Sequence, residues 1–308
     1  MALRIPQLAL LLAFIAPPQF PQGPYTLTTG VDEVSVTFQV ADPHGLPIDD
    51  LTLADLRILD NNKPPREIVS FDLYRNLPLR AGILIDISPS MDGLLKPNAA
   101  TAAEFASHLL HGPQDRAFLM RFDSDAKVVQ DWTLDPTLLT AGITHMIDYR
   151  ASRLGGTVLF DSVYRACRDQ FATLRGAPTG NFILLFTDGA DNASHALLED
   201  DVRICQRAHT AIYAFTSGSG LAFSHAPKSL VELTAQTGGQ LFLNHTEQSL
   251  WTDLLLIEAD LRSQYRIVYK PGLLKSDGSF HRIRLDSPTR GGILTTPSGY
   301  YAPGQSPR

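Results

Sequence analysis

The stretch LRAGILIDISPS, residues 79–90, decides the fold of this chain. Residues 81–85 form a short, continuous apolar run, which is typical of a strand buried on both faces of a parallel sheet. Asp86, Ser88 and Ser90 follow directly, so three oxygen-bearing side chains come where the strand ends. We therefore take this stretch as the first strand of an α/β domain with a polar loop at its carboxyl end.

Short apolar runs alternate with helical spacing from residue 79 to residue 262. A second fully apolar strand is expected at residues 182–186. The other expected strands cover residues 117–122, 126–132, 211–216 and 240–243, and the expected helices cover residues 98–110, 138–147, 159–174, 197–208, 229–237 and 250–262. This alternation predicts a doubly wound, mostly parallel α/β sheet.

The segments on either side of this domain carry strand signals, such as the alternation of apolar and polar residues at 34–40 and the apolar positions at 265–269. The N-terminal segment has too few apolar positions to close a core alone, so we expect the two segments to pair in one small β-sandwich. The expected organisation is a signal peptide at 1–22, an N-terminal β segment at 23–77, the α/β domain at 78–262 and a C-terminal β segment at 263–308.

The first residues have the pattern of a secretory signal peptide. Arg4 precedes a short apolar stretch at residues 8–16, and Pro17 and Pro18 end it. The stretch is too short to span a bilayer, and no later segment is long and apolar enough to anchor the chain. A buried N-terminal strand is the alternative, but the absence of acidic residues before Asp32 favours export. The expected location is periplasmic or secreted.

Charge and cysteine content exclude some classes of protein. The formal net charge is -6, and no Lys/Arg cluster interleaved with aromatic residues is present, so nucleic acid is not an expected partner. Cys167 and Cys205 are the two cysteines, which is too few for a disulfide framework. An exported chain could oxidise such a pair, but we interpret them as two small buried apolar residues and leave them unpaired.

Three loops bear oxygen ligands in an order that fits one site. Asp86, Ser88 and Ser90 follow the first buried strand, Thr157 follows two glycines at the start of an expected helix, and Asp188 follows the second buried strand. Ligands of open α/β sheets bind beyond the carboxyl ends of strands, where the winding reverses. Oxygen ligands select hard cations. Each loop taken alone fits an ordinary turn, and the combination is what indicates a cation site.

At these residues the chain resembles the von Willebrand factor A family, whose metal-ion-dependent adhesion site has the pattern Asp-x-Ser-x-Ser, then Thr, then Asp. The matching positions are Asp86, Ser88, Ser90, Thr157 and Asp188, without substitution. The resemblance covers roughly residues 79–262. It implies that the serines and the threonine coordinate Mg²⁺, or Mn²⁺ or Ca²⁺, and that the aspartates act largely through bound waters.

A cation held mainly by hydroxyl groups is only partly neutralised, so an open coordination position favours an anionic oxygen. The expected partner is therefore a protein ligand that supplies an Asp or Glu carboxylate, and the expected function is cation-dependent binding or adhesion.

The flanking segments resemble a narrower family of exported bacterial proteins related to von Willebrand factor A, seen especially in acidobacteria. The resemblance rests on short matches in both segments: Asp42, Gly45 to Ile48, Leu51, Asp55, Leu56, Ile68 and Phe71, then Gln264, Tyr265, Tyr269, Asp277, Gly278, Phe280, His281 and Gly299 to Tyr301. Asn61 and Asn62 stand where that family usually has a glycine turn, and Asn tolerates the left-handed conformation.

Two other functions compete with cation-dependent binding. A metal-assisted hydrolase would need a base or nucleophile, but His111, His145 and His195 are scattered and the chain lacks the usual hydrolase motifs, so we do not expect an enzyme. A scaffold or assembly subunit with a permanently bound metal is the second alternative. Asp123 and Asp125 are interpreted as a solvated hairpin turn rather than as further ligands. The Asn192 and Asn244 glycosylation sequons are taken as coincidental.

Overall fold

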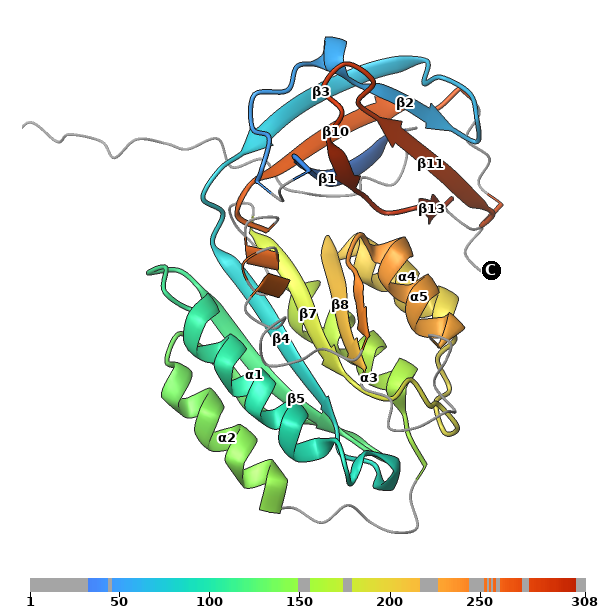
Figure 1. Ribbon diagram of the computed structural model, residues 1–308. Coiled ribbons are helices and arrows are strands. Elements are labelled where there is room, and N and C mark those ends of the chain that lie inside the picture. The colour runs from blue at the N-terminus through green and yellow to red at the C-terminus, as the bar shows by residue number, and fades with distance from the viewer. Residues whose placement is uncertain are drawn as a thin grey trace, which may run out of the picture.

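The computed structural model has an α/β domain with an all-β unit lying against one end of it (Figure 1). It describes residues 33–43, 46–148, 156–173, 179–216, 227–243, 252–253, 255, 257–258, 261–272 and 277–302. The expected signal peptide at 1–22 and the sequon at Asn244 lie outside these residues. Within the described part, no helix is both long and apolar enough to cross a membrane.

The sheet of the α/β domain has six strands in the order β6-β5-β4-β7-β8-β9. Their bounds are β4 (Leu79–Asp86), β5 (Arg116–Phe122), β6 (Ala126–Thr133), β7 (Gly180–Phe186), β8 (Thr210–Thr216) and β9 (Leu241–Leu243). β4 pairs in parallel with β5 on one side and β7 on the other, and β6 runs antiparallel at one edge. The chain winds outward from β4 in one direction and then returns to β7 and winds in the other. The predicted doubly wound, mostly parallel sheet is confirmed.

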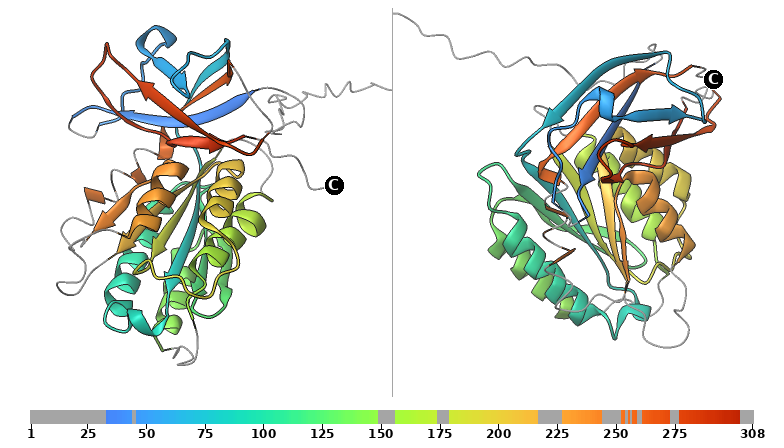
Figure 2. Two further views of the ribbon diagram at one scale, coloured as in Figure 1. Left: turned by 90° about the vertical axis from the view of Figure 1, so that its right-hand side faces the viewer. Right: turned by 45° about the horizontal axis from the view of Figure 1, so that its top comes forward.

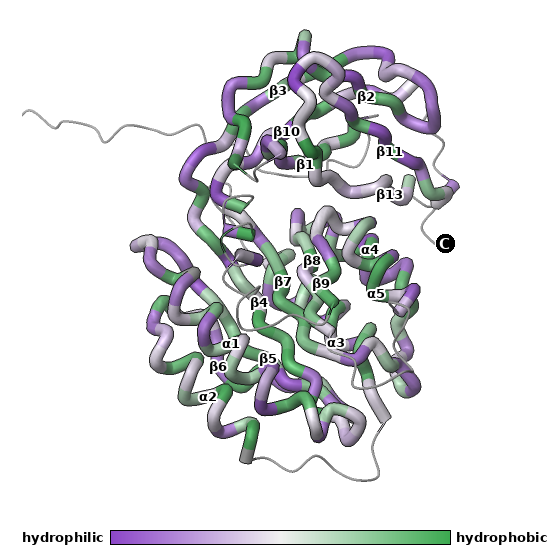
Figure 3. The backbone as a smooth tube through the Cα atoms, viewed as in Figure 1, coloured by the Kyte–Doolittle hydropathy of each residue, from purple (hydrophilic) through white to green (hydrophobic). Residues whose placement is uncertain are grey.

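Helices cover both faces of this sheet (Figures 1 and 2). Their bounds are α1 (Leu95–Leu109), α2 (Pro136–Asp148), α3 (Leu159–Arg165), the π-helix η3 (Ala166–Phe171), α4 (Leu198–Arg207) and α5 (Lys228–Thr237). Phe105 of α1 and Leu139 of α2 pack in one core with Ile83 of β4, and Val163 of α3 packs in a second core with Leu185 of β7. The strands between these cores are hydrophobic (Figure 3). Burying one such apolar side chain completely contributes about 1.5–3 kcal/mol to the stability of the fold.

The N-terminal and C-terminal segments form a β-sandwich together. One sheet has the order β12-β1-β10-β3 and the other β13-β11-β2. The bounds are β1 (Val34–Ala41), β2 (Arg57–Asp60), β3 (Glu67–Tyr74), β10 (Gln264–Lys270), β11 (Phe280–Asp286), β12 (Ile293–Thr295) and β13 (Gly299–Tyr301), with short helices η1 (Leu53–Asp55) and η2 (Pro89–Met91). The rings of Phe71 and Tyr265 stack at 5.4 Å in its core. The expectation that the two flanks assemble into one sandwich is confirmed.

A buried carboxylate ties the two sheets of the sandwich together. Asp60 accepts hydrogen bonds from the hydroxyls of Tyr269 at 3.0 Å and Tyr300 at 2.7 Å, and Nδ1 of His281 lies 2.8 Å from its other oxygen. Tyr269 lies on β10, whereas His281 and Tyr300 lie on β11 and β13 of the opposite sheet. Buried polar groups need such partners because an unpaired one costs about 1–3 kcal/mol. Asn61 next to Asp60 has a φ of 46°, as its place in the turn requires.

Two connections join the sandwich to the α/β domain, and they lie side by side. The backbone N–H of Leu77, just before β4, donates to the carbonyl of Arg262, just before β10, at 3.1 Å. The Arg262 guanidinium also donates to Asp115 at 2.9 Å. The chain therefore enters and leaves the α/β domain at one place.

The structure departs from the sequence-based expectation of secondary structure in two respects. The helix expected at 159–174 is α3 followed by the π-helix η3, and β13 was not expected. The helix expected at 250–262 lies partly outside the described residues. The described residues of that last stretch are helical, and Leu261 is fully buried.

Cys167 and Cys205 form a disulfide, so our interpretation of them as unpaired was wrong. η3 and α4 pack on the same face of the sheet and bring the two Cα atoms to 5.0 Å, within the range that a disulfide needs. Both residues are fully buried, as expected of small apolar side chains. The sequence analysis therefore predicted the burial of both cysteines correctly. It missed their pairing because that depends on how η3 and α4 lie next to each other.

Candidate metal site

Asp86 ends β4 and is fully buried. Its Oδ1 accepts a hydrogen bond from the backbone N–H of Ser88 at 2.9 Å, and its Oδ2 accepts one from the hydroxyl of Thr187 at 2.7 Å. Burial raises the pKa of Asp86 to about 6, because the charged form is poorly solvated there. The two hydrogen bonds oppose that shift, and the charge of Asp188 adds to it. The carboxylate is thus fixed by groups from β4 and from the end of β7.

Ser88 and Ser90 present two hydroxyl groups at adjacent positions. Their Oγ atoms lie 3.1 Å apart, with Ser88 buried and Ser90 exposed. Pro89 starts the short helix η2 between them, and its fixed φ suits the first position of a helix. Two oxygens that bind Mg²⁺ at right angles, each about 2.1 Å from the ion, lie about 3 Å apart. The spacing of the two hydroxyls therefore suits neighbouring positions around such a cation.

Thr157 is buried and is tied to the loop that follows β7. Its backbone N–H donates to Oδ1 of Asn192 at 2.7 Å, and its carbonyl accepts from the backbone of Asn192 and Ala193, each at 3.2 Å. The next residue, Val158, donates its N–H to the carbonyl of Asp123 at the end of β5, at 2.8 Å. Gly155, the first of the two glycines before Thr157, lies outside the described residues.

Asp188 is partly buried at the end of β7, and its Oδ1 accepts from the backbone N–H of Ala190 at 2.9 Å. β7 pairs with β4 up to Ile85 opposite Phe186, so Asp188 follows the strand next to the one that Asp86 ends. Gly189 follows with a φ of 83°, where a residue with a Cβ would be strained, and this turn aims the N–H of Gly189 at the Thr187 hydroxyl at 3.1 Å. The chain therefore turns sharply directly after Asp188.

The five expected site residues lie at the carboxyl ends of the parallel strands, where the winding reverses between β4 and β7. Direct hydrogen bonds link Asp86, Ser88 and Ser90, and Thr157 is hydrogen-bonded to Asn192 in the loop that also carries Asp188. The set is rich in hydroxyls rather than carboxylates. The described residues contain no group of three or more His, Cys, Asp or Glu side chains that could hold a metal ion.

Two aspartates that the sequence analysis did not consider hold the loop after β7 against α3. Asp191 accepts hydrogen bonds from the N–H of Phe160 at 3.0 Å and the hydroxyl of Ser194 at 2.5 Å. Asp161 accepts from the N–H groups of His195 and Ala196 at 2.9 and 2.7 Å. An acidic residue in the first turn of a helix is the sequence signal that could have indicated Asp161.

Three further expectations concern residues near the site. The side chain of His195 is 96% exposed and lies 3.3 Å from Asp161. Asn192, considered only as a sequon, instead supports Thr157. Asp123 and Asp125 form the predicted hairpin turn, but Asp123 is buried, 3.6 Å from Arg121, so the prediction that it is solvated was wrong. Asp123 lies between the end of β5 and the loop that carries Thr157, and this packing shields its side chain from water.

Solved structures similar to this chain include von Willebrand factor type A domains. Proximal thread matrix protein 1 from the mussel byssus is 18% identical over 61% of this chain and 48% of its own, with a TM-score of 0.47. The von Willebrand factor type A protein from Catenulispora acidiphila is 16% identical over 76% and 72%, with a TM-score of 0.45. The vWF domain of a type V pili tip protein from Porphyromonas gingivalis is 14% identical over 59% and 94%, with a TM-score of 0.46.

The chain spans about half the length of the mussel protein. Another structure of that mussel protein has a zinc-occupied MIDAS motif. No protein-family model and no curated protein matches the chain.

Proposed function

We propose that this chain is an exported protein of von Willebrand factor A type that binds a divalent cation, Mg²⁺ or else Mn²⁺ or Ca²⁺, and uses it to hold a carboxylate of a protein partner. The observation that supports the proposal is the hydrogen-bonded group of Asp86, Ser88 and Ser90 at the end of β4, next to the end of β7 that leads into Asp188, at the point where the sheet changes its winding direction. Open α/β sheets bind their ligands at that point.

The donor set suits a hard cation. Ser88, Ser90 and Thr157 offer neutral hydroxyl oxygens, and Asp86 and Asp188 supply negative charge nearby. Both oxygens of Asp86 already accept protein hydrogen bonds, so we assign Asp86 the role of orienting Ser88 and of balancing the cation's charge through water. Thr187 holds Asp86 in that position.

Such a site would supply Lewis acidity to an incoming anionic oxygen when the cation is bound. Neutral hydroxyl ligands neutralise a 2+ ion only in part, and a partner's Asp or Glu side chain would complete the charge balance. Ser90 is exposed, so this side of the cluster is accessible to a partner. We propose protein binding or adhesion, without catalysis, as the outcome.

Export to the periplasm or to the medium is part of the proposal. The expected signal peptide supports it, and the Cys167–Cys205 disulfide adds independent support because such bonds persist in oxidising compartments.

The proposal is tested in two steps with the full chain. Calorimetric titration with Mg²⁺ should show one site in the wild type and none in Asp86→Ala, whereas Asp125→Ala, which removes an exposed carboxylate from the nearby hairpin, should bind as the wild type does. A pull-down from native envelope or culture medium, with Mg²⁺ or with chelator, then tests the partner. Partner binding that survives chelator and Asp86→Ala would refute cation-dependent recognition.

The same experiments separate the two alternatives. Association that ignores Mg²⁺, combined with a melting temperature that depends on it, would indicate a scaffold with a structural metal. Metal-dependent turnover of an ester panel that is lost in His195→Ala would indicate a hydrolase.

A further inference from the structure

The loops at the carboxyl ends of the strands, where the metal residues lie, are acidic. The loops that follow β4, β5 and β7 are residues 87–94, 123–125 and 187–197, and they contain five Asp residues and no Lys or Arg. Asp92 and Asp125 are exposed. A carboxylate that approaches the proposed cation therefore also meets negative charge that repels it. A partner with positive charge next to its carboxylate would offset this repulsion.

The outer face of the β13-β11-β2 sheet is basic. Every second residue of β11 is buried against the sandwich core, so Arg282, Arg284 and Asp286 lie on the outer face. Arg57 of β2 lies opposite Asp286 on the same face. The three arginines are exposed, and none of them forms an ion pair with another described residue. We refer to Arg57, Arg282, Arg284 and Asp286 as the arginine face.

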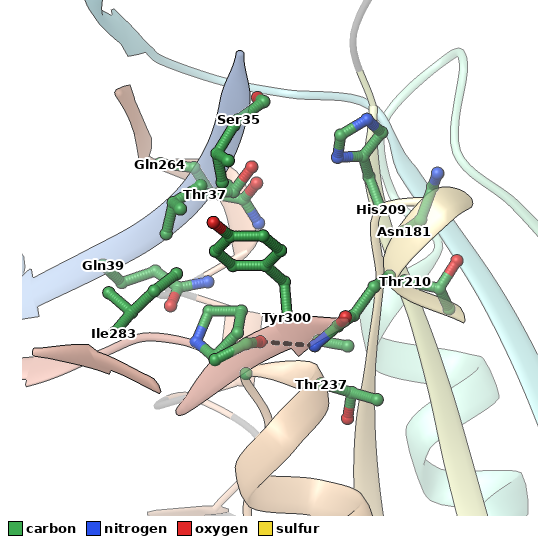
Figure 4. Close-up of a pocket in the computed structure, with 17 residues that line it drawn as sticks. Ser35, Thr37, Gln39, Asn181, His209, Thr210, Thr237, Gln264, Ile283 and Tyr300 are labelled. Carbon is green, nitrogen blue, oxygen red and sulfur yellow. Dashed lines mark hydrogen bonds between the residues drawn. The ribbon is translucent and has the colours of Figure 1, made fainter. Parts of the chain in front are cut away.

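The arginine face is open to solvent because the α/β domain lies against the other sheet of the sandwich. In Figure 4, Thr37 and Gln39 of β1 lie on one side of a small cavity, and Thr210 of β8 lies on the other. β1 belongs to the β12-β1-β10-β3 sheet. The opposite sheet, which carries the arginine face, thus presents its outer side to a partner.

Asp286 is the carboxylate of the arginine face, and no group of the described residues holds it. Within the described part of the sandwich, every other carboxylate except that of Glu33 accepts a hydrogen bond. Glu33 directly precedes β1 and therefore belongs to the sheet that meets the α/β domain. The carboxylate of Asp286 can accept a further partner, while the arginines around it supply positive charge.

The metal residues and the sandwich lie at opposite ends of the α/β domain (Figure 1). The sandwich joins this domain at Leu77, just before the amino end of β4, and the metal residues follow the carboxyl end of the same strand. β4 has eight residues and spans about 26 Å at about 3.3 Å per residue. The carboxylate of Asp286 therefore cannot reach the metal site of its own chain, but it can reach that of a second chain.

We propose that the protein partner is a second copy of this chain, whose Asp286 carboxylate binds the cation at the metal site of the first copy. The arginine face then lies against the acidic loops around that site, so the charges of the two surfaces are complementary. This inference rests on the function proposed above. Because the two contacting surfaces differ, each copy keeps one surface free, and association continues head to tail into rings or filaments.

Sedimentation velocity of the full chain over a range of concentrations tests the inference. With Mg²⁺ the sedimentation coefficient should rise with concentration beyond that of a dimer, and with chelator the chain should stay monomeric. Asp286→Asn removes the charge but keeps the size of the side chain, and it should abolish the association. The matched control Asp72→Asn removes a partly exposed carboxylate from β3 of the other sheet and should associate as the wild type does. Arg284→Gln should lower the association constant about two- to fivefold, as the loss of one exposed ion pair does.

Mixing two variants identifies the head-to-tail contact. Asp86→Ala lacks a working metal site and Asp286→Asn lacks the carboxylate, so each variant alone should be monomeric. Each keeps the surface that the other lacks, so an equal mixture should form heterodimers and nothing larger. Circular dichroism checks that both variants fold. Arg284→Glu, which reverses one charge of the arginine face, replaces Asp286→Asn if that variant does not fold.

Calorimetric titration of the dilute, monomeric chain with Mg²⁺ separates this inference from the proposed function. Mg²⁺ binding without association would overturn the second copy as the partner and leave the cation site standing. Absence of Mg²⁺ binding would overturn both. The inference is also overturned if association survives chelator, if Asp286→Asn associates as the wild type does, or if the mixture of variants stays monomeric.

Discussion

The Thr187→Val substitution removes a hydroxyl that links the ends of β7 and β4. Thr187 donates to Oδ2 of Asp86 at 2.7 Å and accepts from the N–H of Gly189 at 3.1 Å. Valine has nearly the same shape, so the cores on either side should stay filled. The buried carboxylate of Asp86 then keeps the hydrogen bond from Ser88 but loses this second one.

The size of the effect follows from the environment of the bond. A hydrogen bond to a charged group contributes about 1.5–3 kcal/mol, and at Asp86 no solvent can replace the lost donor because the residue is fully buried. Residues that orient metal ligands in this way typically change metal affinity about 10–100-fold. We therefore expect Thr187→Val to weaken Mg²⁺ binding within that range while the protein stays folded.

The assay is calorimetric titration with Mg²⁺ at neutral pH, accompanied by urea unfolding. Thr187→Ser keeps the hydroxyl and serves as the matched control, so it should restore most of the affinity. Equal Mg²⁺ affinity in the wild type and Thr187→Val would refute the inference that Asp86 must be held from β7. Loss of affinity in Thr187→Ser as well would point to packing rather than to the hydrogen bond.

Three further predictions concern stability. Asp201 is fully buried, both its carboxylate oxygens lack partners within the described structure, and its pKa is raised well above the usual value by burial and neighbouring acidic residues. The folded protein therefore favours the protonated form of Asp201 more than the unfolded chain does. The stability gained in this way is lost as the pH rises from the ordinary aspartate pKa through the raised pKa of the folded state. Asp201→Asn should raise the unfolding free energy at pH 7 by about 1–3 kcal/mol and flatten its dependence on pH, and a destabilised variant in urea unfolding would contradict this. Replacing both Cys167 and Cys205 by alanine removes a disulfide that closes a loop with a sequence separation of 38, and should lower the free energy of unfolding by about 3–4 kcal/mol. Urea unfolding against the oxidised wild type measures the difference. A decrease below about 1 kcal/mol would argue against the disulfide. Asp60→Ala removes the buried carboxylate that Tyr269, Tyr300 and His281 share, which leaves Tyr300 and His281 only their 3.2 Å contact with each other, and should destabilise the protein by about 3–5 kcal/mol in the same assay. An unchanged midpoint would mean that water replaces the carboxylate.

The pattern of apolar and polar residues along the sequence predicted the strands and the first loop of the site, which carries Asp86, Ser88 and Ser90. The apolar run before Asp86 could be recognised because a strand covered on both faces has no polar positions. The alternation at residues 34–40 predicted β1 for the complementary reason, that one of its faces meets a core and the other does not. In each case neighbouring residues in the sequence carry the information.

The features that were missed depend on contacts between distant segments. Thr187 bonds a residue 101 positions away, and Asn192 supports Thr157 from a separation of 35, so neither role is visible in its own neighbourhood. The pairing of Cys167 with Cys205 depends on how η3 and α4 pack. Contacts of this kind can be predicted only when the order of the strands in the sheet is known.

The paired connections at Leu77 and Arg262 decide how a load would pass through the molecule. A partner that pulls on the far end of the α/β domain acts on the sandwich through two covalent segments held together, not through one linker. The domain is thereby restrained from swivelling about a single bond, and the tension divides between β3 in one direction and β10 in the other. These two strands are neighbours in the same sheet, paired from Gln264 opposite Tyr74 onward, so the force meets a row of backbone hydrogen bonds at the point where it enters the sandwich.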